Sequence, residues 1–137
     1  MGTAIKTVMI IDDSTFDLYI ASSMIRNNKF AENVMEYSNA EKALLYLQDN
    51  QDDLKKLPKV IFLDIYMPFM TGFEFLERYA KLSDKLKKYC RVYVLSSTIA
   101  DSDIERTLID LNTESFLLKP LTKEFLDDIN AAQSDPV

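Results

Sequence analysis

Apolar residues occur along the chain in two different periods. Five short runs are rich in branched and aromatic side chains, and the first, third and fourth are nearly continuous, as is typical of parallel strands covered on both faces. The runs are residues 7–11, 33–37, 60–63, 92–95 and 115–118. We therefore expect five strands in a sheet whose two faces are both covered.

The segments between and after these runs carry apolar residues at every third or fourth position, which is the period of a helix with one buried face. The stripes start at Phe16, Ala43, Phe73, Ile104 and Phe125. Four of them follow a Ser or Thr with an acidic residue three positions later, the pattern of a capping box. The four pairs are Ser14 with Asp17, Ser38 with Glu41, Thr71 with Glu74, and Ser102 with Glu105. The alternation predicts an α/β fold of five βα units with a parallel sheet and helices on both faces.

One segment between the third stripe and the fourth run is strongly charged. Residues 83–88 read Ser-Asp-Lys-Leu-Lys-Lys. We interpret this segment as a solvated surface extension, because charged runs between elements are more often solvated than part of a binding site.

Composition narrows the possible classes of protein. The 137 residues, with 47% hydrophobic and 28% charged, fit one globular domain, and no apolar run approaches the roughly 18 residues of a membrane span. A net charge of −6 disfavours a nucleic-acid surface. Histidine is absent, which excludes Ser-His and Cys-His nucleophile pairs and His metal ligands. The lone Cys90 and the lack of a secretory segment lead us to expect a cytoplasmic protein.

Polar residues stand where four of the five expected strands end. Asp12 and Asp13 follow the first run, Asp64 the third, Ser96 the fourth and Lys119 the fifth. Each has an ordinary structural explanation, such as an acid that complements a helix dipole or a Lys-Pro pair that ends a strand. Ligands of parallel sheets, however, bind beyond the carboxyl ends of the strands, and all of these residues fall on that edge. We therefore expect a functional site there.

The three acids indicate the chemistry of this site. If the first and third strands are neighbours, about 4.8 Å apart, then Asp12, Asp13 and Asp64 lie close together. Unit charges about 4 Å apart interact by about 4 kcal/mol at an effective dielectric near 20, so the cluster needs a cation or a raised pKa. Oxygen ligands without histidine or thiolate select Mg²⁺ or Mn²⁺. With Lys119 and the Ser96 hydroxyl, these groups suit phosphoryl transfer to a carboxylate.

The motifs together resemble the receiver domain of two-component response regulators, especially stand-alone receivers of the chemotaxis type. They are Ile10-Ile-Asp-Asp-Ser, Asp64-x-x-Met-Pro with Gly72, Leu95-Ser-Ser and Leu118-Lys-Pro, and the resemblance covers residues 6–132. It implies a flavodoxin-like (βα)5 three-layer sandwich with strand order 2-1-3-4-5, in which the first and third strands are neighbours.

The resemblance also implies roles for single residues. Asp64 corresponds to the phosphoacceptor, which attacks the phosphohistidine of a partner histidine kinase or histidine phosphotransfer protein. Asp13 corresponds to the direct Mg²⁺ ligand, Asp12 to the acid that acts through a bound water, and Tyr66 to the residue whose backbone carbonyl completes the metal site. Lys119 corresponds to the lysine that contacts the acyl phosphate, and its bond to the following proline to the family's cis peptide.

The switch residues and the output surface are implied in the same way. Ser96 corresponds to the switch hydroxyl, with Ser97 as an alternative. Phe116 corresponds to the switch aromatic, although a phenylalanine has no phenol and also fits a role in core packing alone. The fourth helix, fifth strand and fifth helix are expected to contact the downstream protein. The segment Leu111–Ser115 is one residue longer than the family's usual turn, so the resemblance leaves the shape of this surface open.

Three functions are compared on this basis. The first is a single receiver domain, residues 1–137 without an output domain, that catalyses only its own phosphotransfer and dephosphorylation and signals by protein contact, with no direct nucleic-acid or membrane partner. The second is a pseudo-receiver, a binding module that does not depend on phosphorylation. The third is an aspartate-nucleophile phosphohydrolase, which requires Asp-x-Asp after its first strand, where this chain has Asp12-Asp13-Ser14. We favour the first.

Tyr66 and Thr98 flank the expected site at positions that influence water access in the family.

Overall fold

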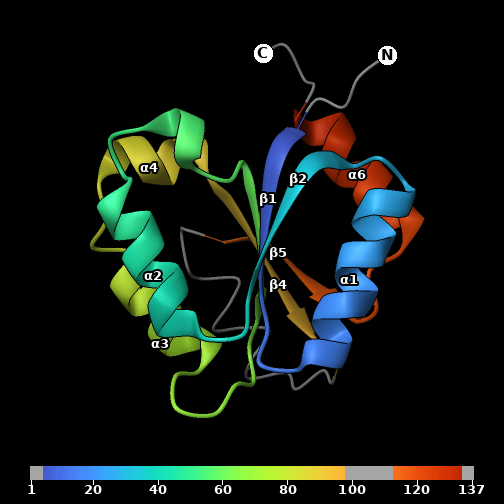
Figure 1. Cartoon of the computed structure of the whole chain (residues 1–137), viewed down its shortest axis with the longest axis horizontal. Helices are drawn as coiled ribbons and strands as arrows, with labels where there is room; N and C mark the ends of the chain where they lie inside the picture. The colour runs from blue at the N-terminus through green and yellow to red at the C-terminus, as the bar shows by residue number, and fades with distance from the viewer. Residues whose placement is uncertain (1–4, 98–112, 134–137) are drawn as a thin grey trace.

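Five parallel strands form one sheet in the order β2-β1-β3-β4-β5 (Figure 1). The computed structural model describes residues 5–97 and 113–133. The strands are β1 Ile5–Ile11, β2 Ala31–Tyr37, β3 Val60–Asp64, β4 Arg91–Ser96 and β5 Thr113–Leu118. The expected strand order 2-1-3-4-5 is confirmed.

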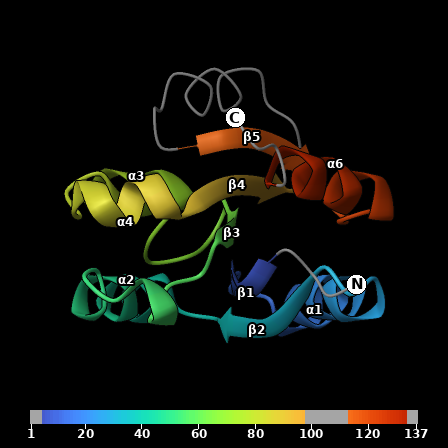
Figure 2. The same ribbon diagram turned by 90° about the horizontal axis from the view of Figure 1, so that it is seen from above.

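Helices cover both faces of the sheet, so the molecule has three layers (Figure 2). The helices are α1 Thr15–Asn27, α2 Ala40–Asp49, α3 Gly72–Tyr79, α4 Asp84–Tyr89 and α6 Lys123–Gln133, with a short 3-10 helix, η1, at Leu54–Lys56. Helices α1 and α6 lie on one face, and α2, α3 and α4 on the other. The helix expected to begin near Ile104, and its Ser102–Glu105 cap, lie outside the described residues. None of the described helices is long and apolar enough to cross a membrane.

Two apolar cores hold the sheet between its helices. On the α1 and α6 side, the ring of Phe62 lies 6.2 Å from that of Phe30 and 6.0 Å from that of Tyr93, centroid to centroid. On the other side, Phe75 and Tyr79 of α3 stack at 5.9 Å. Every residue of β3 is buried. Each large apolar side chain contributes about 1.5–3 kcal/mol to the stability of the fold when it is fully buried. A shift of β3 along its axis would expose some of these side chains, so the two cores hold the end of β3 in place.

The expected helix starts are correct at two places and wrong at a third. Thr71 and Glu74 form a complete capping box. Ser14 caps α1 by accepting from the backbone N–H of Asp17 at 3.2 Å. The cap of α2 is not Ser38 but the next residue, Asn39, whose side chain accepts from the N–H of Lys42 at 3.0 Å. Asparagine and serine are comparably good caps, so the pattern in the sequence did not decide between them.

The charged segment 83–88 is part of an ordered helix. Ser83 caps α4 by accepting from the N–H of Leu86 at 3.2 Å, and the Leu86 side chain is completely buried in the core beside α2 and α3. The interpretation as a solvated extension is therefore wrong at this residue. A single apolar residue was enough to anchor the turn, because it supplies the buried face that the charged residues lack.

A β-bulge interrupts the pairing near the start of the fifth strand. Val92 pairs with Thr113, whereas Tyr93 pairs with Ser115, so Glu114 has no partner in the register. The regular pairing resumes at once, with Val94 opposite Phe116. The bulge therefore leaves the register at the carboxyl end of β5 regular.

Gly72 is required because α3 begins against the end of β3. Its N–H donates to the carbonyl of Ile65 at 2.9 Å, and a Cβ placed on it would lie 2.8 Å from the Cα of Ile65 and 2.9 Å from the carbonyl oxygen of Asp64. These neighbours are backbone atoms, which cannot move aside without shifting the site.

We expect Gly72→Ala to lower the free energy of unfolding by about 1–3 kcal/mol, because the added methyl overpacks this contact. Urea denaturation measures the change. Glu77→Ala, at an exposed position of the same helix, serves as the control and should change stability by less than about 0.5 kcal/mol. Equal stability of the glycine and alanine proteins would contradict the close approach.

Candidate functional site

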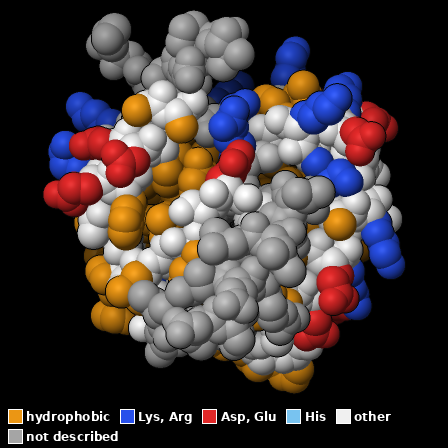
Figure 3. Space-filling view, turned by 180° about the vertical axis from the view of Figure 1, so that it is seen from behind, with side chains coloured by type: hydrophobic (Ala, Val, Ile, Leu, Met, Phe, Trp, Pro, Cys, Tyr) orange, Lys and Arg blue, Asp and Glu red, His pale blue; other side chains and the backbone are white. Residues whose placement is uncertain are grey.

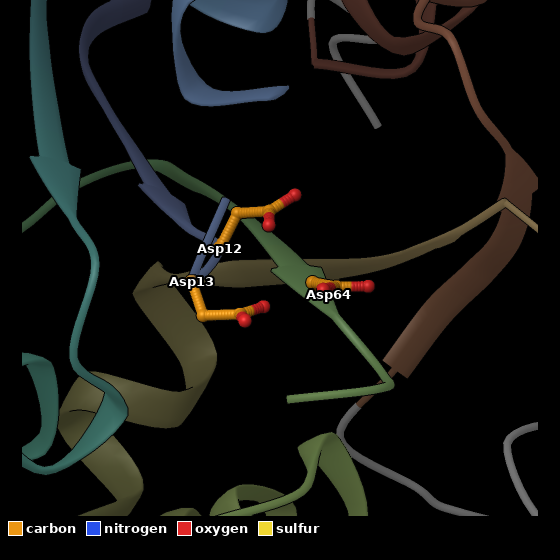
Figure 4. A group of neighbouring side chains, drawn as sticks. All are labelled: Asp12, Asp13 and Asp64. Atoms are coloured by element: carbon orange, nitrogen blue, oxygen red, sulfur yellow. The ribbon is translucent and has the colours of Figure 1, made fainter. Parts of the chain in front are cut away.

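Three carboxylates gather at the carboxyl edge of the sheet. Asp12 and Asp13 follow β1 and Asp64 ends β3, and the register pairs Ile11 with Leu63. One carboxylate oxygen of each acid lies within 4.8 Å of those of the other two (Figure 4). Asp12 and Asp64 are 3% and 6% exposed, whereas Asp13 is open to solvent. The structure thus brings together the three acids that the sequence suggested.

Local hydrogen bonds hold Asp12 in place. The backbone N–H of Ser14 donates to its Oδ1 at 2.9 Å, and its own N–H donates to the carbonyl of Tyr37 at 3.0 Å. The turn that begins α1 therefore also fixes the first acid of the site. Asp13 lines a depression of about 540 Å³ that is bordered by the starts of α1 and α2 and by the loop Met67–Met70.

Lys119 joins the acids from the far end of the chain. Its ammonium lies 2.6 Å from Oδ2 of Asp12, 2.9 Å from Oδ2 of Asp17 and 3.5 Å from Oδ1 of Asp64. The backbone N–H of Lys119 donates to the carbonyl of Ser96 at 2.8 Å, and the bond to Pro120 is cis, as the resemblance implied. The lysine is thus placed by its backbone as well as by its charge.

Asp17 is a member of the site that the sequence reasoning missed. The pairing of Ser14 with Asp17 in the sequence predicts that this carboxylate completes the cap of α1, but it accepts a hydrogen bond from Lys119 instead. No local pattern indicates this role, because the lysine that Asp17 contacts is 102 residues away in the sequence. Three carboxylates, those of Asp12, Asp17 and Asp64, therefore lie within 4 Å of the Lys119 ammonium.

The charges of this site shift the pKa values of its members. Burial, and then the neighbouring Asp12 and Asp13, raise the pKa of Asp64 to about 7, although Lys119 opposes the shift. Burial by itself lowers the pKa of Lys119, but hydrogen bonds to Asp12 and Asp17 outweigh it and raise that pKa to about 12. Lys119 is therefore fully protonated, yet it neutralises only part of the negative charge.

The acids suit a hard divalent cation. Three carboxylate groups within reach of one another offer oxygen ligands only, which is the donor set that Mg²⁺ prefers. Asp13 is exposed, and the depression beside it has room for water ligands. Asp12, Asp13 and Asp64 could therefore hold Mg²⁺. The Tyr66 carbonyl as a further ligand stays a prediction; the Tyr66 side chain is 46% exposed.

The expected switch residues lie on β4 and β5. Ser96 is the last residue of β4 and is fully buried, whereas Ser97 is exposed. Phe116 is half-buried and packs against the core beside α2 and α3. Its packing role is thus visible in the structure, and its role as a switch stays a prediction. Thr98 lies outside the described residues.

The chain is similar to known proteins in both sequence and fold. The sequence model of the family of response regulator receiver domains matches residues 8–130 of this chain. The two-component response regulator ORR11 of Oryza sativa subsp. indica is 32% identical over 120 residues, which cover 88% of this chain and 75% of that protein. A two component response regulator from Cytophaga hutchinsonii has a similar structure, with a TM-score of 0.87, 22% identity, and coverage of 94% of this chain and 96% of that one. A response regulator receiver protein from Dyadobacter fermentans also has a similar structure, with a TM-score of 0.84 and 29% identity. The match covers 93% of this chain and 97% of that one.

We expect Asp64→Asn to stabilise the cation-free protein at pH 8 by about 1 kcal/mol, since it removes a buried charge beside Asp12 and Asp13 and water at the edge screens part of the gain. The pKa of Asp64 is raised from 3.8 to about 7 in the folded state. Protonated Asp64 therefore stabilises the folded parent at low pH, and the parent loses this stabilisation as the pH rises from about 4 to 7. The variant shows no such loss, because its asparagine does not titrate.

Urea denaturation in EDTA at pH 4.5 and pH 8 tests the difference, with the exposed Asp128→Asn as the charge-matched control. The gain from Asp64→Asn should grow with pH, and the control should show no such growth. A gain that is equal at both pH values would contradict the interaction among the acids.

Proposed function

The chain belongs to the family of response regulator receiver domains, and on this premise we propose that it is a phosphorylation switch whose acceptor is Asp64. The phosphoryl group comes from the phosphohistidine of a histidine kinase or a histidine phosphotransfer protein. The observation that carries this proposal is the position of Asp64 among two further acids and one lysine at the carboxyl edge of the sheet.

The geometry supports each part of the transfer. A carboxylate oxygen of Asp64 forms the new bond to phosphorus as the bond from phosphorus to the histidine nitrogen breaks, and the imidazole leaves with the electron pair of that bond. Lys119 lies 3.5 Å from Oδ1 of Asp64, so its ammonium can reach an oxygen of a phosphoryl group attached there. Bound Mg²⁺ would neutralise charge on the phosphoryl oxygens, which is the main requirement of this chemistry.

Side chains near Asp64 can also shape the phosphorylated state. The backbone of Lys119 is hydrogen-bonded to Ser96, at the end of the strand beside β3. We propose that the Ser96 hydroxyl reaches the phosphoryl group and that Phe116, which already packs on the core, repacks in response. Phenylalanine offers only apolar contacts for this, so its repacking would be driven by shape and burial.

The signal then leaves by protein contact. We propose that the chain acts as a single receiver domain in the cytoplasm and that its downstream partner binds a surface including β5 and α6. The expected fourth helix would complete this surface but lies outside the described residues. Direct contact with nucleic acid is disfavoured by the net charge of −6.

The pseudo-receiver is the weaker alternative. It predicts that an essential acid or the lysine is missing, but Asp13, Asp64 and Lys119 are all present and Asp64 lies beside the other two. An independent phosphohydrolase is also weaker, because Asp12 and Asp13 are adjacent rather than an Asp-x-Asp pair, and the third acid, Asp64, comes from β3.

Incubation with Mg²⁺ and acetyl phosphate should add the mass of one phosphoryl group per chain. Asp64→Asn should abolish the adduct, while Asp128→Asn should keep it. Intact-protein mass spectrometry reads both. An adduct that survives Asp64→Asn would remove Asp64 as the acceptor, and the absence of any adduct on the parent, together with no binding of millimolar Mg²⁺, would favour the pseudo-receiver.

Tyr66→Asn should speed loss of the phosphoryl group several-fold, because we propose that the half-exposed ring of Tyr66, two residues after Asp64, shields the phosphoryl group from water. Decay of the phosphorylated protein after removal of the donor measures the rate. Phe69→Asn is the matched control, since Phe69 lies in the same loop, is fully exposed and has a φ of 68°, a backbone conformation that asparagine accepts readily. A Tyr66→Asn rate no faster than the parent's would refute the shielding.

A further inference from the structure

The end of the sheet opposite the acids is rich in basic side chains. The stretches 54–59 and 85–91 contain seven Lys and Arg residues and no Asp or Glu, although the chain as a whole has a net charge of −6. Figure 3 shows Lys and Arg side chains gathered at the upper right of the back face, the end at which α4 lies in Figure 1. This concentration has no role in the phosphorylation site at the other edge.

Backbone pairing brings the basic stretches together where β1, β3 and β4 begin. The N–H of Lys59 donates to the carbonyl of Thr7, and the N–H of Arg91 donates to the carbonyl of Lys59, both at 2.9 Å. The ammonium of Lys59 lies 4.5 Å from the centre of the Tyr89 ring, within the range of a cation–π contact. Burial and the nearby Arg91 lower the pKa of Lys59, as expected where positive charges are crowded.

A cleft of about 200 Å³ opens among these residues. Its apolar part is formed by Leu54, Leu57 and Tyr89, and its cationic rim by Lys6 and Lys55. The backbone N–H of Lys55 donates to Oδ1 of Asp53 at 3.1 Å, but within the described ranges no carboxylate lies within 4 Å of the ammonium group of either lysine. The two rim ammonium groups therefore have no partner of opposite charge among the described residues. We call this feature the amino-edge cleft.

We propose that the amino-edge cleft binds a short acidic peptide segment of a partner protein, with one apolar side chain inserted between Leu54, Leu57 and Tyr89. Its volume is below the roughly 300 Å³ of small-molecule pockets and suits a single side chain. Carboxylates on either side of that residue would pair with Lys6 and Lys55 on the rim.

The charge of the rest of the molecule limits the length of the ligand. A long polyanion, such as nucleic acid, would extend from the cleft over a surface whose overall charge is negative, and it would be repelled there. A segment of a few residues stays within the basic region. The cleft lies at the opposite edge from Asp64, so a peptide bound there would not contact the phosphorylation site.

The probe is a fluorescein-labelled pentapeptide with one leucine between two pairs of glutamates, and fluorescence anisotropy with the whole chain measures its binding. We expect saturable binding that weakens at least tenfold in the double variant Lys6→Glu, Lys55→Glu. The control is Lys42→Glu, Lys123→Glu, which makes the same charge change at exposed sites outside the cleft and should weaken binding less than twofold. Glycine in place of the peptide's leucine should weaken it several-fold.

Amide chemical shifts of the parent on titration locate the probe independently of the variants, and those of Lys6, Lys55 and Tyr89 should move most. Asp64→Asn should bind the peptide as the parent does, which separates this proposal from that of the phosphorylation switch. The proposal is overturned by equal losses in the two double variants, by no saturation at millimolar protein, or by tighter binding of a short oligonucleotide at the same residues.

Discussion

The mutual repulsion of three carboxylates is the constraint on which the functional edge of this protein depends. Asp12, Asp13 and Asp64 are close only because β1 and β3 are neighbours in a parallel sheet, and Lys119 offsets part of their charge. Burial, and then the repulsion from Asp12 and Asp13 that Lys119 does not offset, raise the pKa of Asp64. A site with this residual negative charge favours a compact cation.

The two apolar cores explain why the acids do not simply move apart. All five residues of β3 are buried, with core side chains on both faces, so Asp64 cannot retreat without opening one of the cores. Gly72 holds the next helix against the same strand end by backbone contact. Burial energy that is spread over many side chains thereby maintains an unfavourable arrangement at one edge, as is common at functional sites.

The sequence predicts the strands and the polar residues at their ends because both depend on local pattern. It does not by itself place β1 beside β3; that step came from resemblance to a family. Asp17 was missed because a carboxylate three residues after Ser14 has two possible partners, the helix cap and a lysine 102 residues away, and local pattern reveals only the first. The cap of α2 at Asn39 reflects competition between two neighbouring residues that cap helices about equally well. The burial of Leu86 depends on tertiary packing, which local pattern does not show.

The contact between Asp12 and Lys119 joins residues that are 107 positions apart. Such a large sequence separation raises the contact order, and the loop between the two residues must close before their attraction is gained. Any partly folded form in which β1 and β3 have paired before β5 joins them holds the carboxylates without their ammonium. Ions that screen these acids should therefore change the rate at which the chain folds. Lys119, which follows β5, supplies the positive charge that Asp12, which follows β1, lacks until then.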